Sequence, residues 1–267
     1  MDSTASHKKP KKDRYLFPTS AGIFLTNACP LRCVYCSDDS GINAATLSKN
    51  QIQNYLRLIV KKAIIRRYAL KSESCDCILD ITGGGEPTSR LEILKYCIET
   101  FKRLCQDAGA APHIAITTNG ACSRETVDFL IANTDLITIS YDGMSAIQNR
   151  NRRCKSGAPS DEIVSGTIRH VNDSGHPYVI RTTIGKDDYI RLNEMFDHIR
   201  QNYGHVLTWH IEPIYRIGRG TRCEMAYTSF AECYLDLLEY SKDKKHDFQI
   251  ANTAFSEDIN LPMCDSL

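Results

Sequence analysis

Residues 136–142, Leu-Ile-Thr-Ile-Ser-Tyr-Asp, alternate between apolar and polar side chains from Ile137 onward. Successive side chains of a β-strand point to opposite faces, so Thr138, Ser140 and Asp142 share one face and the isoleucines share the other. A central strand of a flat parallel sheet is covered by helices on both faces and is apolar nearly throughout. This strand therefore favours a curved sheet with a polar interior.

Five further β-rich segments flank this strand along the chain, and four of them show the same alternation. The segments are residues 22–27, 77–83, 113–119, 178–184 and 205–213. Their polar faces carry Asp80, Thr82, Thr117, Asn119, Arg181, Thr183, Thr208, His210 and Glu212. Their apolar faces carry Leu79, Ile81, Ile114, Ile116, Ile180, Ile184, Leu207, Trp209 and Ile211. The polar faces are expected to converge on a wet or ligand-filled cavity, because burying them without partners costs about 1–3 kcal/mol each.

Segments with helical spacing separate the strands. Ser48 is a candidate N-cap for the first helix, and residues 89–92 have the form of a capping box for the second. Further helices are predicted at 124–132, 160–174, 189–203 and 228–245. Strict alternation of strands and helices implies parallel strands with right-handed crossovers. The sequence thus predicts an α/β fold, a partial (β/α)6 barrel with its site at the carboxyl ends of the strands.

Composition limits the class of protein. The 267 residues fit one barrel-like domain, and 42% hydrophobic with 24% charged residues is ordinary for a packed protein. A net charge of +1 gives no case for nucleic acid or membrane as a partner. Residues 1–17 are polar and lysine-rich and are expected to form a flexible arm. Without a long apolar run or a signal peptide, the chain is expected to be cytoplasmic.

Three of the twelve cysteines lie within eight residues, directly after the first predicted strand. Cys29, Cys33 and Cys36 have the spacing Cys-x3-Cys-x2-Cys. Structural zinc usually needs a second Cys or His pair at similar spacing, and a ferredoxin-type carrier needs a fourth cysteine. Three thiolates can instead hold a [4Fe–4S] cluster with one iron open to another ligand. Cys75 and Cys77, before the second strand, are expected to be structural.

The cysteine loop and four later segments together resemble the radical S-adenosylmethionine (radical SAM) superfamily over about residues 18–220. The later segments are Gly84-Gly85-Glu86-Pro87, Thr117-Thr118-Asn119-Gly120, Ser140-Tyr141-Asp142-Gly143 with Arg152, and Glu212-Pro213 with Gly218-Arg219-Gly220. The third and fourth are similar to the peptide- and sulfatase-maturing (SPASM/Twitch-like) branch. Where that branch has a His-Asp pair, this chain has Gln148-Asn149.

The resemblance implies a set of site residues. Cys29, Cys33 and Cys36 would ligate the cluster. The residues implied in binding S-adenosylmethionine are Gly84, Gly85, Glu86, Pro87, Asn119, Ser140, Asp142, Arg152 and Glu212. Within this set Glu86 would meet the methionine amino group, and Ser140 and Arg152 the carboxylate or ribose. The alternative for Arg152 is a surface arginine in a basic stretch.

The resemblance also implies a reaction. S-Adenosylmethionine would be cleaved reductively to a 5′-deoxyadenosyl radical that abstracts a hydrogen from the substrate, with electrons from a reductase or flavodoxin-type donor. A peptide or protein side chain is the favoured substrate, and small-molecule or cofactor biosynthesis is the alternative. Outside enzymes, an iron–sulfur sensor or electron carrier remains open. Arg181 and His210 are candidates to face substrate or cofactor, although Arg181 could instead pair with Glu212 or Asp80.

The predicted organisation has three parts. Residues 18–225 would form the barrel core, and residues 226–267 a C-terminal helix and the start of an auxiliary-cluster extension. Cys264 is then either the first ligand of an extension that the chain contains only in part, or an ordinary terminal thiol.

Overall fold

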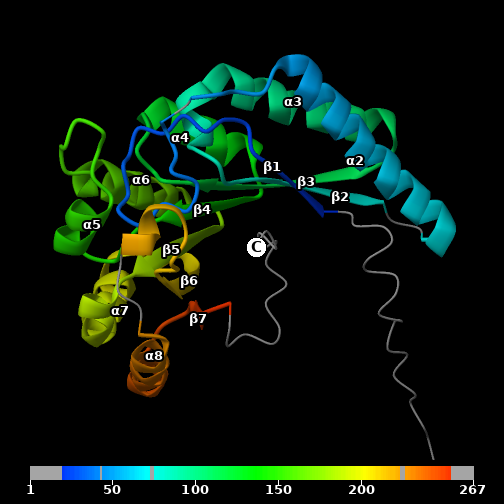
Figure 1. The fold of residues 1–267 in the computed structure, drawn as a ribbon. Helices are drawn as coiled ribbons and strands as arrows, with labels where there is room; N and C mark the ends of the chain where they lie inside the picture. The colour runs from blue at the N-terminus through cyan, green and yellow to red at the C-terminus, as the bar shows by residue number, and fades with distance from the viewer. Residues whose placement is uncertain (1–19, 43, 73–74, 223–225, 254–267) are drawn as a thin grey trace, which may run out of the picture.

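The computed structural model describes residues 20–42, 44–72, 75–222 and 226–253. The expected N-terminal arm and Cys264 lie outside these residues. The described chain forms one sheet of seven parallel strands in the order β1-β2-β3-β4-β5-β6-β7. Figure 1 shows the strands side by side in this order, with helices along the outside of the curved sheet. The predicted α/β class with parallel strands is confirmed.

The strands are short, and most begin or end within two residues of their predicted bounds. They are β1 (Ser20–Ile23), β2 (Asp76–Ile81), β3 (Ala111–Thr118), β4 (Leu136–Ser140), β5 (Tyr178–Ile184), β6 (Val206–Pro213) and β7 (Gln249–Ala251). β1 ends at Ile23 rather than residue 27, which lengthens the loop that carries the cysteines. The seventh strand was not predicted, because three residues are too few to show a period.

The α-helices cover the apolar face of the sheet. They are α2 (Lys49–Leu70), α3 (Leu91–Asp107), α4 (Arg124–Asn133), α5 (Ser145–Asn151), α6 (Asp161–Ser174), α7 (Leu192–Asn202) and α8 (Tyr227–Lys242). The core contains strand side chains such as Ile81, Ile139 and Trp209, together with helix side chains such as Leu56 and Phe196, all fully buried. Burying this apolar face on the helices leaves the other face of the sheet to line a cavity.

The two predicted helix starts have different outcomes. Ser48 caps α2 in a complete capping box with Gln51, as expected. The capping box predicted at residues 89–92 is wrong, because Pro87–Arg90 form a separate 3₁₀ turn capped by Glu86. The Ser89 hydroxyl donates to the Glu86 carbonyl instead of capping α3.

Leu207 also departs from its expected place on the apolar face. The pairing of β5 with β6 shifts register here, since Tyr178 pairs with Val206 and Val179 pairs with Thr208. The extra residue of such a bulge has no partner in the ladder. Leu207 is accordingly exposed, whereas Trp209 and Ile211 beyond it are buried as predicted.

Candidate active site

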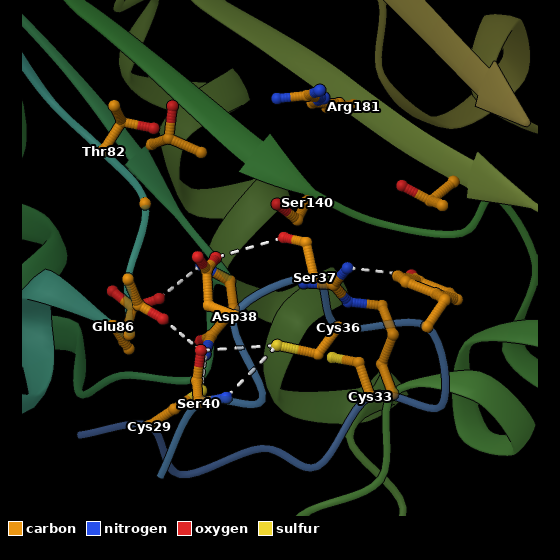
Figure 2. A pocket seen from close by; sticks show the side chains of 18 of the residues that line it. Cys29, Cys33, Cys36, Ser37, Asp38, Ser40, Thr82, Glu86, Ser140 and Arg181 are labelled. Carbon is orange, nitrogen blue, oxygen red and sulfur yellow. Dashed lines mark hydrogen bonds between the residues drawn. The ribbon is translucent and has the colours of Figure 1, made fainter. Parts of the chain in front are cut away.

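A cavity of about 450 Å³ opens at the carboxyl ends of the strands. The three cysteines line it together with side chains from the polar strand faces, namely Thr82, Thr117, Asn119, Ser140, Arg181, Thr183 and Glu212. Gly84, Gly85, Glu86 and Arg152 also line the cavity. Figure 2 shows the cysteines, Glu86, Ser140 and Arg181 around this space. The expected polar cavity, of a size suited to a small-molecule ligand, is therefore present.

The cysteine loop supplies three thiols, and hydrogen-bond donors lie near the sulfurs of two of them. The Asn119 side-chain amide lies 3.5 Å from the Cys29 sulfur, and the Ser40 backbone N–H lies 3.5 Å from the Cys36 sulfur. The Ser40 hydroxyl donates to the Gly84 carbonyl, which ties the loop to the glycine segment. Donors of this kind orient thiolate ligands and tune the metal that they hold.

The donor set fits an iron–sulfur cluster better than a single ion. Within the described ranges, no three His, Cys, Asp or Glu side chains converge closely enough to hold one metal ion. In a cubane cluster each cysteine binds a different iron, so its sulfurs stand farther apart than around one ion. Burial raises the pKa of the Cys29 thiol to about 11, so ligation of iron there must release a proton.

The glycine segment after β2 approaches the cysteine loop closely. The Gly85 N–H donates to the Thr26 carbonyl at 2.7 Å, and the Glu86 N–H donates to the Ala28 carbonyl at 2.7 Å. A Cβ at Gly85 would lie 2.3 Å from the Ala28 carbonyl oxygen. Only glycine permits this contact, which sets the position of the loop that carries Cys29.

The Glu86 carboxylate is buried and already engaged. One oxygen accepts from the Thr88 hydroxyl and backbone and from the Thr118 hydroxyl, and the other accepts from the Asn119 N–H at 2.6 Å. Burial raises the pKa of Glu86, although these hydrogen bonds oppose the shift. The carboxylate therefore joins the ends of β2 and β3, and its expected contact with an amino group stays a prediction.

Arg152 is buried, with 6% of its surface exposed, so the surface-arginine alternative is wrong. Its Nη1 donates to the Tyr35 hydroxyl at 2.9 Å, and that hydroxyl donates to the Asp142 carboxylate at 2.7 Å. Burial raises the pKa of Asp142 to about 6, against the opposing charge of Arg152. Tyr35 was missed in the sequence, although it stands between Cys33 and Cys36, because its partners lie more than 100 residues away.

Three predicted residues lie behind the cavity wall rather than on it. Asp142 is fully buried beside Tyr35, and Pro87 begins the 3₁₀ turn. His210 is 2% exposed, and its Nε2 lies 2.7 Å from the Glu212 carboxylate. Hydrogen bonds from His210, Thr253 and Tyr215 outweigh burial and lower the pKa of Glu212 to about 2. His210 thus orients Glu212, and its predicted contact with a substrate finds no support in the cavity lining.

Gln148 and Asn149, which replace the His-Asp pair, have structural contacts. The Gln148 side-chain oxygen accepts from the Asp142 N–H at 3.0 Å. The Asn149 side-chain oxygen accepts from the N–H groups of Ser160 and Asp161, at the start of α6. The pair therefore fixes the end of β4 and supplies a cap to α6 from another helix.

The segment after β6 closes over the cysteine loop. The Arg219 Nε donates to the Cys33 carbonyl at 2.8 Å, its N–H donates to the Cys36 carbonyl at 2.9 Å, and its Nη1 pairs with Asp39 at 2.6 Å. Gly218, with a φ of 52°, passes so close that a Cβ would lie 2.4 Å from the Cys36 carbonyl. Arg219 thus clamps the backbone that bears two of the three cysteines.

Arg219→Gln is expected to loosen this clamp without removing a thiol. Since supporting contacts around metal ligands are worth about tenfold or more in metal affinity, iron should leave the variant about tenfold faster. The measurement is iron release to a chelator from the reconstituted protein. Arg216→Gln, an exposed residue of the same segment, is the matched control. Equal release rates for native and Arg219→Gln protein would contradict the clamp.

Asp80, on the polar face of β2, should make stability depend on pH. Burial raises the pKa of Asp80 from 3.8 to about 6, while Arg181 opposes the shift. The folded state therefore binds this proton more tightly than the unfolded chain, so its stabilising effect is present below about pH 4 and lost as pH rises through about 6. Urea unfolding from pH 4 to 7 should show a shallower fall in the unfolding free energy for Asp80→Asn than for the native chain. Equal slopes for Asp80→Asn and the native chain would contradict the raised pKa of Asp80.

The sheet and the cavity together define an α/β protein with three cysteines and a polar cavity at the carboxyl ends of its strands. The Radical SAM superfamily matches residues 23–199, and the chain belongs to this superfamily.

Curated GTP 3′,8-cyclases are similar in sequence to the chain. It is 30% identical over 182 residues to the GTP 3′,8-cyclase of Corynebacterium glutamicum, covering 64% of this chain and 44% of the cyclase. It is 28% identical over 152 residues to the GTP 3′,8-cyclase of Listeria monocytogenes, covering 54% of this chain and 39% of that one. The chain thus spans less than half the length of these curated relatives.

Solved structures share the fold at low identity. The anSMEcpe with bound AdoMet and Kp18Cys peptide matches with a TM-score of 0.67 at 16% identity, over 83% of this chain and 60% of that one. Streptococcus suis SuiB bound to precursor peptide SuiA matches with a TM-score of 0.63 at 17% identity, over 90% of this chain and 50% of that one. In the described residues, no helix is both long and apolar enough to span a membrane.

Proposed function

We propose that this chain is a radical SAM enzyme that cleaves S-adenosylmethionine reductively and abstracts a hydrogen atom from a substrate. The observation that carries the proposal is that Cys29, Cys33 and Cys36 on one loop and the Gly84–Glu86 segment on another line the same cavity. Superfamily membership implies a [4Fe–4S] cluster and S-adenosylmethionine. When bound, these groups supply a 5′-deoxyadenosyl radical.

The residues of the chain have separate tasks in this proposal. Cys29, Cys33 and Cys36 hold the cluster, and Asn119 and Ser40 donate hydrogen bonds toward the thiolates. The polar wall formed by Ser140, Thr183 and Glu212 would bind S-adenosylmethionine, while the glycine segment lets the ligand approach backbone groups. Binding inside this cavity would limit the access of water to a reactive intermediate.

The substrate that we favour is a peptide or protein side chain. Support comes from the fold shared with anSMEcpe and SuiB, which were solved with peptides, although identities of 16–17% carry the fold alone. A specific observation favours the alternative, a small molecule of cofactor biosynthesis, because the GTP 3′,8-cyclases are 28–30% identical to the chain. An electron donor of the reductase or flavodoxin type is part of either proposal.

The reaction is tested by anaerobic reconstitution with iron and sulfide, reduction with dithionite and addition of S-adenosylmethionine. We expect 5′-deoxyadenosine from the native chain and none from the Cys29→Ala/Cys33→Ala/Cys36→Ala variant. Cys233→Ala on α8, a free thiol away from the cavity, is the matched control and should keep the product. A cluster that forms but yields no 5′-deoxyadenosine, with a paramagnetic resonance spectrum unchanged by S-adenosylmethionine, would favour a sensor or carrier.

The substrate is tested with the same reconstituted protein. Peptides and GTP are incubated separately, and products are followed by mass spectrometry beside 5′-deoxyadenosine. A peptide mass change with no product from GTP supports the peptide reading. Turnover of GTP, with every peptide unchanged, would show that the substrate is a small molecule and not a peptide.

A further inference from the structure

Arg181 points from the middle of β5 into the cavity. In the sheet its neighbours in register are Ser140 of β4 and His210 of β6. Figure 2 shows Arg181 well away from Cys33 and Cys36, with Ser140 between them in that view. The guanidinium therefore lies on a part of the cavity wall remote from the cysteine loop.

No described residue forms a hydrogen bond or ion pair with the Arg181 guanidinium. The carboxylates that could neutralise it are engaged elsewhere. Glu212 accepts from Tyr215 at 2.9 Å and lies 2.7 Å from His210, and Glu86 accepts from Thr118 and Asn119 at the end of β3. Asp80 is near enough for the charge of Arg181 to oppose the rise of its pKa, but it makes no ion pair. Both pairings weighed from the sequence, with Glu212 and with Asp80, are thus not formed.

The charges around the cavity favour a ligand with one negative charge. Among described residues, the cationic side chains that line it are Arg152 and Arg181, and Arg152 is bonded to Tyr35. Asp38, Glu86 and Glu212 line the same cavity as carboxylates. A polyphosphate would therefore meet one unpaired guanidinium and three acidic side chains. A single carboxylate would be matched by the one unpaired guanidinium.

We propose that Arg181 is the subsite for one carboxylate of the substrate, supplied by an acidic residue or the C-terminus of a peptide. The inference rests on the proposed function in that it takes this cavity to be the place where the substrate reacts. A planar guanidinium binds a carboxylate through two parallel N–H···O hydrogen bonds, which fixes orientation as well as position. Arg181 would thus orient an acidic peptide for hydrogen abstraction while making no contact with the cysteines.

The test is a binding titration of the full chain, with S-adenosylmethionine present, followed by ligand-observed NMR at neutral pH. The probes are N-acetyl-glutamate N-methylamide, its glutamine counterpart, N-acetyl-alanine for a terminal carboxylate, and GTP. We expect the glutamate probe or N-acetyl-alanine to bind, and the glutamine probe to bind about tenfold more weakly or worse. Which of the two carboxylate probes binds tells the side-chain source from the terminal source.

Arg181→Gln is expected to abolish the preference for the carboxylate, and Arg181→Lys to keep part of it, because a charge remains but the two-pronged geometry is lost. Arg169→Gln, an exposed arginine on α6, is the matched control and should bind as the native chain does. Near-ultraviolet circular dichroism compares the folding of all variants. If only Arg181→Gln is misfolded, Arg181→Lys decides the outcome, since native-like binding by it would overturn the two-pronged contact.

Other results would overturn the proposal. Equal discrimination by native and Arg181→Gln protein removes the subsite. Tighter binding of GTP than of either carboxylate, lost in Arg181→Gln, assigns the residue to a phosphate. Discrimination that is seen in a parallel titration without S-adenosylmethionine but is absent with it places the probe in the cofactor's own site. The titration needs no turnover, so absence of 5′-deoxyadenosine would overturn the reaction alone and leave the subsite standing.

Discussion

Gly85→Ala is expected to leave the chain with all three cysteines but without a stable cluster. The added Cβ would meet the Ala28 carbonyl oxygen at 2.3 Å, the Asn27 carbonyl carbon at 2.5 Å and the Ala28 nitrogen at 2.8 Å. All three are backbone atoms, so no side chain can turn aside to make room. The cysteine loop must move away from β2, which breaks the hydrogen bonds from Gly85 and Glu86 to that loop.

We expect this variant to lose about 3 kcal/mol of unfolding free energy, at the upper end of the usual cost of overpacking. Iron and sulfide content after reconstitution, together with urea unfolding, measure the two effects. Gly204→Ala is the matched control, since a Cβ there has no atom within 4 Å. A Gly85→Ala protein that binds iron like the native chain would mean that the two loops are not held in contact.

Arg152→Met should be the most destabilising change of a charged residue in the site. It removes the cation that opposes the buried Asp142 carboxylate and takes a partner from the hydroxyl of Tyr35, a residue that stands between Cys33 and Cys36 in the sequence. Arg152 and Asp142 are joined through the Tyr35 hydroxyl and not by a direct ion pair, so leaving these buried groups without the guanidinium should cost about 1–3 kcal/mol. The pKa of Asp142, already about 6, should rise further, so the deficit should shrink as pH falls from neutral toward 5 and Asp142 becomes neutral.

Urea unfolding at several pH values measures this deficit, and the Arg152→Met/Asp142→Asn double variant tests its cause. If the loss comes from an uncompensated carboxylate, the double variant should recover part of the stability of the native chain. Arg153→Met, at the exposed neighbouring position, should change stability little. A deficit that is the same at every pH and in the double variant would assign the effect to lost packing.

The alternation of the strands made the cavity predictable, because a period of two needs no knowledge of distant residues. Thr82, Ser140, Arg181 and Thr183 line it as that pattern required. The pattern could not show how deeply each side chain is buried. His210 was therefore expected to face the ligand as Glu212 does, although it lies behind Glu212 and does not line the cavity. Nor could it show bulges, which is why Leu207 was assigned to the wrong surroundings.

Contacts between loops were the part that local sequence could not supply. Tyr35 bonds to a residue 107 positions later, and Arg219 bonds to one 186 positions earlier. The resemblance assigned ligand-binding roles to Glu86 and Asp142, but both carboxylates already accept hydrogen bonds from protein groups. The binding roles of Ser140, Arg152 and the glycine segment stay predictions, as do the domain bounds 18–225.

The clamp of Arg219 on the cysteine loop sets an order of assembly. Each strand pairs with its neighbour in the sequence, so the sheet can grow one unit at a time as the chain leaves the ribosome. The cysteines emerge with the first unit, yet the bonds to the carbonyls of Cys33 and Cys36 come from a segment after β6. The cysteines are thus made first, but the contacts that hold the backbone of Cys33 and Cys36 can form only after β6 has been synthesised.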